Sequence, residues 1–200
     1  MNGFVGNVID VQTAFWIAQA IGVVTTVVAI MCLQLKNMTA ILICQLAANT
    51  LAALSYLFNS EGLSGVGISI IAVVQALVMF FYDKKGKRPH WILTALFITA
   101  YAGYTVGVAV IEHSFSPFVF LPMMAAVCYA LAIVQKKPSL YRIFGMINPI
   151  FWIVYDASIN HPANFIMHTC ILISAISGII RLDIIANRKN KKSKKLKELK

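Results

Sequence analysis

The residues that could do chemistry in this chain are amide and aromatic side chains set inside long apolar stretches. Asn49 and Asn148 each lie near the middle of such a stretch. An amide offers two donors and an acceptor, and burying it in hydrocarbon without a partner is costly. We therefore expect the two asparagines to bind a neutral polar solute, such as a polyol, sugar or nucleoside. An equally supported alternative is that the two asparagines form interhelical hydrogen bonds that only hold the bundle together.

Further polar and aromatic candidates lie in the same kind of stretch. Trp152 follows Asn148 by four residues, so the two share one helical face. Its indole could stack on a ring-shaped solute, or could simply pack. Gln19 is another intramembrane amide that could contact the solute. Pro122 and Pro149 remove backbone donors and permit bending, which makes them candidate hinges, although proline is also common in membrane helices.

Catalytic and metal chemistry find little support in the sequence. His168 has no carboxylate at the centre of any apolar segment to form a proton relay with, so a packing histidine is expected. Residues 62–65 read Gly-Leu-Ser-Gly, as in rhomboid proteases, but the surroundings of His168 lack the glycines that such an active site needs. The cysteines show no C-x-x-C spacing. We expect no enzyme activity, no metal and no cofactor.

The composition indicates a membrane protein. Of 200 residues, 60% are hydrophobic and 12% are charged, whereas soluble domains are about 45–50% apolar and about 25% charged. A spanning helix needs about 20 apolar residues, and only helices satisfy their own backbone groups in lipid. The chain therefore predicts an all-α, polytopic protein in a lipid bilayer. Its seven transmembrane helices are expected at 14–33, 39–58, 63–82, 91–111, 117–134, 141–159 and 163–185.

The charges predict an orientation. Counted with these segments, all 17 Lys and Arg residues fall on the side of the first, third and fifth loops and the C-terminal end, whereas Asp10, Glu61, Glu112 and Asp156 fall on the other side. The positive-inside rule then places the N-terminus outside and the C-terminus in the cytoplasm. The basic tail 186–200 is a topology anchor that could also bind anionic lipid. Nucleic acid is not an expected partner, because no basic face of a soluble domain is present.

An internal repeat is suggested by a shift of 99 residues, which places Asn49 on Asn148 and Tyr56 on Tyr155. A three-helix unit ends on the opposite side of the membrane from where it begins. One extra helix between two such units is therefore needed for both to cross the membrane in the same direction. Gly103 and Gly107 in this extra helix favour close packing within the chain over dimerisation, and the oligomeric state stays open. The expected divisions are a first repeat at 1–82, a linker helix with its flanking loops at 83–116, a second repeat at 117–185 and the tail at 186–200.

Trp16, Gln19 and Gly22, followed by a Gln–Lys turn and an Asn in the second segment, resemble the YgjV-type bacterial inner-membrane family. The 3+1+3 pattern is similar to the wider PQ-loop group, which includes sugar transporters of the SWEET type and nicotinamide-riboside transporters of the PnuC type. Gln34 and Gln135 stand where that group has its Pro-Gln pair, although no proline precedes either of them.

The resemblance implies a fold, a bacterial inner membrane and further site residues. In SWEET-like proteins the third helix of each repeat contributes to the site, which makes Gln75 and Ser174 candidates. The function expected is a small-solute transporter or facilitator that works by alternating access around a midplane site. The alternative is a scaffold or accessory subunit that transports nothing and whose amides are structural.

Overall fold

The chain forms a bundle of α-helices. A computed structural model describes residues 10–58, 63–87, 89–111, 117–135, 137–158 and 162–185. This part contains seven α-helices and no strand, as expected of an all-α protein. The tail 186–200, Glu61, Glu112 and the side chain of Asp156 lie outside the described residues. The helices are α1 (Val11–Gln34), α2 (Met38–Leu57), α3 (Leu63–Lys84), α4 (Trp91–Ile111), α5 (Leu121–Ile133), α6 (Pro138–Ser158) and α7 (Pro162–Gly178).

Five of these helices are long and apolar enough to cross a membrane: α1 to α4, and α7 continued by a π-helical segment, η2 (Ile179–Ile185). The α-helix α5 has 13 residues and is preceded by a 3-10 turn, η1 (Pro117–Phe120). α6 has 21 residues but carries polar groups such as Arg142 and Asn148. These two helices are the ones that met the length for a span only narrowly in the sequence.

The two candidate hinge prolines sit in different helical contexts. Pro122 occupies the first turn of α5, where a missing N–H costs no hydrogen bond of that helix. Pro122 therefore interrupts no hydrogen bond within α5, and its role as a hinge stays a prediction. Pro149 lies inside α6 and is fully buried. It removes a donor from the helix, as the sequence suggests.

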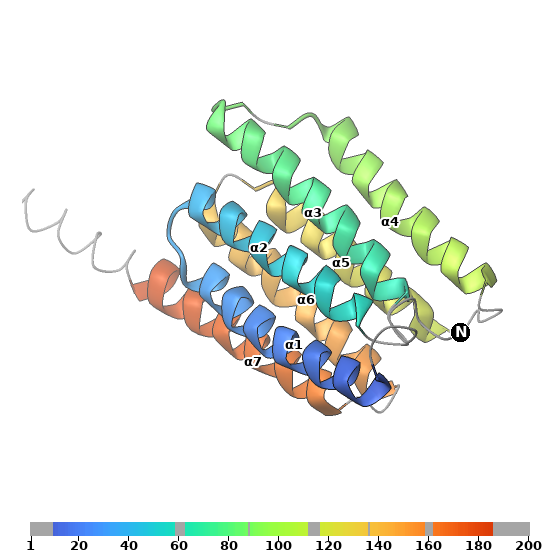
Figure 1. Cartoon of the computed structure of the whole chain (residues 1–200). Coiled ribbons are helices and arrows are strands. Elements are labelled where there is room, and N and C mark those ends of the chain that lie inside the picture. The colour runs from blue at the N-terminus through green and yellow to red at the C-terminus, as the bar shows by residue number, and fades with distance from the viewer. Residues whose placement is uncertain are drawn as a thin grey trace, which may run out of the picture.

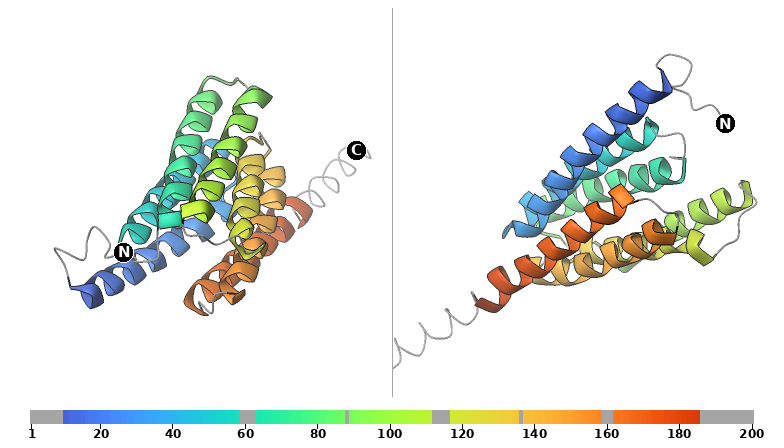
Figure 2. Two further views of the ribbon diagram at one scale, coloured as in Figure 1. Left: turned by 90° about the vertical axis from the view of Figure 1, so that its right-hand side faces the viewer. Right: turned by 90° about the horizontal axis from the view of Figure 1, so that it is seen from below.

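Six helices form a closed ring. α2 packs against α1 and α3, and α6 packs against α5 and α7. The ring closes where α1 meets α7 and α3 meets α5 (Figure 1), while α4 lies outside and packs mainly against α3, α5 and η1. In the right-hand view of Figure 2, α1–α3 lie on one side of the bundle and α5–α7 on the other. We call these the first half and the second half.

The two ends of the bundle differ in charge. α1, α3, α5 and α7 end, and α2, α4 and α6 begin, at the same end (Figure 1). We call it the basic end, because every described Lys and Arg lies near it, whereas Asp10 lies at the opposite end. The basic residues are Lys36, Lys84, Lys85, Lys87, Lys137, Arg142 and Arg181.

The outward face of α4 is open. A Cβ added at Gly103 or Gly107 would meet nothing within 4 Å. The expectation that this small-residue pair lets α4 pack closely within the chain is therefore wrong. α4 packs instead through buried side chains on another face, among them Phe97, Tyr101 and Thr105.

Candidate functional site

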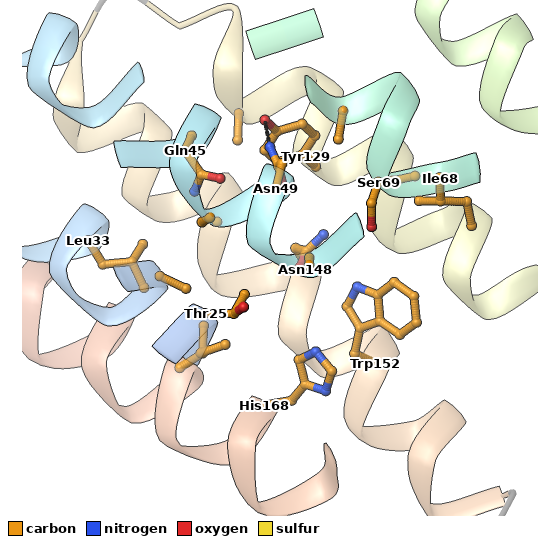
Figure 3. A pocket seen from close by; sticks show the side chains of 18 of the residues that line it. Thr25, Leu33, Gln45, Asn49, Ile68, Ser69, Tyr129, Asn148, Trp152 and His168 are labelled. Carbon is orange, nitrogen blue, oxygen red and sulfur yellow. Dashed lines mark hydrogen bonds between the residues drawn. The ribbon is translucent and has the colours of Figure 1, made fainter. Parts of the chain in front are cut away.

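A cavity of about 200 Å³ lies inside the ring of six helices (Figure 3). All six ring helices contribute to its wall, and α4 contributes Tyr101. No Lys, Arg, Asp or Glu is among the described residues that line it. Much of the wall is alanine, and small side chains on packed helices leave the space that the cavity occupies. The polar lining side chains are Thr25, Gln45, Asn49, Tyr56, Ser69, Tyr101, Tyr129, Tyr141, Asn148, Trp152 and His168.

Asn49 from the first half and Asn148 from the second half both lie on the wall of this cavity (Figure 3). The Asn49 Nδ2 group donates to the Tyr129 hydroxyl at 2.7 Å, drawn as a dashed line in Figure 3. The Asn148 Nδ2 group donates to the backbone carbonyl of Ala125 at 2.6 Å. Among the described residues, no hydrogen bond reaches the side-chain oxygen of either asparagine. Each amide is therefore held through its own Nδ2 group, while its side-chain oxygen stays available as an acceptor.

Gln45 repeats this arrangement one turn nearer the basic end. Its Nε2 group donates to the Tyr141 hydroxyl, which lies across the cavity on α6. Since the hydroxyls of Tyr129 and Tyr141 accept in these bonds, each keeps a proton that it can donate. Within the described chain, these protons go to no protein acceptor. The wall thus offers both donors and acceptors to a bound molecule.

Aromatic rings line the end of the cavity away from the basic loops. The indole of Trp152 stacks on the His168 imidazole, with ring centroids 5.4 Å apart and planes 8° from parallel. Trp152 lies one turn beyond Asn148 on the cavity face of α6, as its spacing predicts. His168, expected to be a packing residue, reaches the wall from α7. Sequence gave no signal for this, because the spacing of one histidine does not say which face of its helix lines a cavity.

Gln75 lies behind the cavity wall rather than on it. It is fully buried on α3, and its Oε1 accepts a hydrogen bond of 3.0 Å from the Tyr101 hydroxyl. Its Nε2 has no partner within the part of the chain that the structure describes. Tyr101 therefore stands between Gln75 and the cavity. The role expected for Gln75 in direct contact with a solute is not supported by its position.

Ser174 and Gln19 also lie off the main cavity. Ser174 is at the seam between α1 and α7, where its Oγ and backbone carbonyl each accept from Gln34 Nε2 at 2.9 Å. Gln135, just beyond the end of α5, instead donates to the backbone carbonyl of Leu131 in that helix. Gln19 lines a second pocket of about 70 Å³ toward the end opposite the basic loops. That pocket shares three lining residues with the main cavity: Thr25, Ala52 and Tyr56.

A buried ion pair at the basic end was not anticipated from the sequence. Arg142 is 3% exposed and pairs with Asp183 at 2.7 Å. The loop-by-loop charge count treats Arg142 as a loop residue near the start of the sixth segment. α6 begins earlier than expected, at Pro138, because proline suits the first helical position. This earlier start places Arg142 one turn inside the helix.

Two further hydrogen bonds at the basic end match each other. Thr39 Oγ1 donates to Asp83 at 2.6 Å in the first half, and Ser139 Oγ donates to Asp183 at 2.7 Å in the second half. Each bond joins residues 44 positions apart, and the second pair follows the first by 100 residues. Each ties the first turn of a middle helix to the end of the helix after it. This offset is the signal that could have drawn attention to Asp183.

The side chains that line the cavity can form hydrogen bonds and stack on rings. The cavity wall pairs amides with phenols and offers stacking rings, which recognise uncharged polar molecules. Over the described ranges, no three His, Cys, Asp or Glu side chains gather as metal ligands would. The four cysteines are free thiols, and Cys32 is fully buried.

Apolar spanning helices around a central cavity define a multi-pass helical membrane protein. Residues 16–184 match the Imp-YgjV family, described as a bacterial inner membrane protein, and the chain belongs to this family. The resemblance seen in Trp16, Gln19 and Gly22 is thereby confirmed, as is a location in the inner membrane. No curated protein matches the chain, and no solved structure does.

Proposed function

We propose that this protein is a transporter or facilitator for a small neutral polar solute, which binds in the central cavity. One observation carries the proposal: Asn49 and Asn148, one from each half, present free amide oxygens to the same uncharged cavity. In transporters built from two halves, the substrate lies near the midplane at their interface, and access alternates as one half rocks against the other. We propose seven spans, with the N-terminus outside and the C-terminus in the cytoplasm.

The size and chemistry of the cavity support a solute with one ring. A cavity of about 200 Å³ exceeds the roughly 150 Å³ that accepts benzene and lies below the roughly 300–1,000 Å³ of drug-sized sites. Its donors and acceptors serve hydroxyl or amide groups, and Trp152 offers a ring face. The absence of charged groups from the described wall disfavours ions and zwitterions. Candidate classes are sugars, nucleosides and vitamin precursors.

We also propose that the halves are copies in a 3+1+3 arrangement of the PQ-loop kind. The divisions are those expected from sequence, at 1–82, 83–116 and 117–185. The matched bonds of Thr39 and Ser139 support an offset of 100 residues rather than 99. With this offset five pairs of positions all line the cavity: Ala29 and Tyr129, Gln45 and Gly145, Ala48 and Asn148, Ala52 and Trp152, and Ile68 and His168. Asn49 and Asn148 then stand at neighbouring, not equivalent, positions.

A non-transporting scaffold is the second candidate. It is favoured by the bond from Asn49 to Tyr129 on α5 and the bond from Asn148 to Ala125 on the same helix. Such interhelical bonds stabilise a bundle by about 0.6 kcal/mol each. In a scaffold, an alanine at either position would lower stability and change nothing else.

A thermal-shift screen of neutral metabolites on detergent-purified protein tests the proposal. A ligand at 100 times its Kd should stabilise the protein by about 2.7 kcal/mol. The shift should vanish in Asn49→Ala. It should persist in Thr50→Ala, the matched control, because Thr50 is exposed and bonds only to Leu46 of its own helix. If sugars, nucleosides and vitamin precursors at millimolar concentration all give no shift, and Asn49→Ala is merely less stable, the scaffold is the better account.

A further inference from the structure

The buried guanidinium of Arg142 connects the two halves at the basic end of the cavity. Its Nε and Nη2 donate to the two oxygens of Asp183 at 3.1 and 2.7 Å, and its Nη1 donates to the backbone carbonyl of Leu35 at 2.8 Å. Arg142 and Asp183 belong to the second half, whereas Leu35 ends α1 in the first half. Two of the three bonds are therefore internal to one half, and the third crosses between the halves.

We propose that the bond from Arg142 to Leu35 is a latch that closes the basic end of the cavity. A solute leaves or enters on that side only when this bond opens. The proposal rests on the proposed function, because a latch needs an occupant to retain. Its physical basis is the division of bonds: Asp183 neutralises the guanidinium in both states. Opening the latch therefore leaves no buried charge unpaired, which would be the costly event.

Neighbouring contacts at this end also hold the two halves together. Gln34 Nε2 donates to Ser174 on α7, and Gln34 Oε1 accepts from Arg181 Nη2 at 2.7 Å. These bonds hold the last turn of α1 against α7 and η2. Arg181 and Asp183 both lie on the π-helical segment η2, and π-turns are frequent at functional sites. One segment thus carries both the partner of Gln34 and the partner of Arg142.

Contacts within each half occur at the opposite end of the bundle. There, Ser55 Oγ donates to the backbone carbonyl of Ala18 in the first half, and Trp152 stacks on His168 in the second half. Hydrogen bonds between the halves occur at the basic end and at the cavity itself, through Gln45 and Asn49. The bonds of Arg142 and Gln34 therefore join the two halves on the basic side of the cavity, which is where a latch has an effect.

The first half has no equivalent of Arg142. With the offset of 100 residues, Leu42 occupies the corresponding position, and the Asp83 carboxylate accepts from Thr39. The bond from Thr39 to Asp83 lies at the same end and joins α2 to α3 within one half. It therefore provides a matched control, since breaking it disturbs the same region without touching a contact between the halves.

The test is thiol accessibility of a reporter cysteine on the cavity wall. Ala132 lines the cavity near the basic end and is 1% exposed. Ala132→Cys is made after replacing the four native cysteines, and a membrane-impermeant thiol reagent is applied to vesicles of both orientations. In Arg142→Leu/Asp183→Leu we expect labelling at least tenfold faster than in the parent, from one side only. The double change removes both charges together and leaves neither unpaired.

Two further variants keep the result interpretable. Arg142→Lys retains a charge for Asp183 but cannot hold its carboxylate and Leu35 together through a fork of donors, so an intermediate rate is expected. Thr39→Ala should label at the parental rate. A folded double variant that labels no faster than the parent overturns the latch, as does equal acceleration by Thr39→Ala. Labelling needs no solute. If the double variant labels faster but no metabolite gives a thermal shift, transport is rejected and the latch at the basic end of the cavity is retained.

Discussion

Gly178 on α7 lies against the backbone of Leu33 on α1, and a Cβ added at Gly178 would stand 2.9 Å from the Leu33 carbonyl oxygen. The same Cβ would come within 3.3 Å of the Arg142 Cδ. A carbonyl oxygen in a helix backbone cannot move aside as a side-chain end can. The two halves therefore approach each other closely here through a residue that has no side chain.

We expect Gly178→Ala to lower the free energy of unfolding by about 1–3 kcal/mol, the usual cost of overpacking. Gly103→Ala is the control, because nothing lies within 4 Å of its new Cβ. Replacing this helical glycine should raise stability by up to about 1 kcal/mol. Thermal unfolding in one detergent measures both. Effects of the same sign at the two positions would contradict the close contact between α1 and α7.

The second prediction concerns the interior proline of α6. Pro149→Ala restores an N–H that can reach the carbonyl of Gly145, which is a cavity residue. The gain of about 3 kcal/mol in helix propensity exceeds the loss of about 1–2 kcal/mol from two buried methylene groups. We expect higher thermal stability, retained ligand binding and slower transport, because a straighter α6 rocks less readily.

Pro122→Ala is the matched control for this change. Pro122 is also buried, but it lies in the first turn of α5, so alanine there gains no hydrogen bond. We expect a small loss of stability and an unchanged transport rate. Uptake into proteoliposomes is the measurement, once a solute is known. If both substitutions slow uptake equally, α6 has no special role as a hinge.

The third prediction ranks two changes at one hydrogen bond. Tyr101→Phe removes the only donor to Gln75 within the described chain and leaves both polar atoms of a fully buried amide unpaired, at about 1–3 kcal/mol. Gln75→Leu removes the amide and leaves the Tyr101 hydroxyl at the cavity, so it should cost less. Unfolding measurements test the order. Ligand affinity should survive Gln75→Leu, because this residue is not on the wall.

The long apolar stretches in the sequence were sufficient to predict the helices of the described chain, although not the residue at which α6 begins. The sequence also predicted that Asn49 and Asn148 act together, and both line one cavity. This prediction was possible because polar groups in apolar helices face inward whatever their partners. The sequence misplaced Gln75, because inward-facing positions divide into those on a cavity wall and those behind it. Only the neighbouring side chain distinguishes the two cases, and here that side chain is Tyr101 from α4.

The ion pair escaped prediction for a different reason. Counting charges by loop treats Arg142 and Asp183 as separate topology signals 41 residues apart. Whether they meet depends on where α6 begins and on how α7 ends in a π-helical segment. Both are local backbone details. The offset of 100 residues, visible in Thr39 with Asp83 and Ser139 with Asp183, was hidden by the more conspicuous alignment of the two asparagines.

Tyr101 reaches the cavity from a helix that stands outside the ring. Two separate three-helix chains that paired with each other would therefore lack part of this wall. Two identical chains would also carry the same residue at equivalent positions. In this chain the offset of 100 residues places Leu42 in the first half where the second half has Arg142. A single chain can therefore carry different residues in its two halves, as this one does at Leu42 and Arg142.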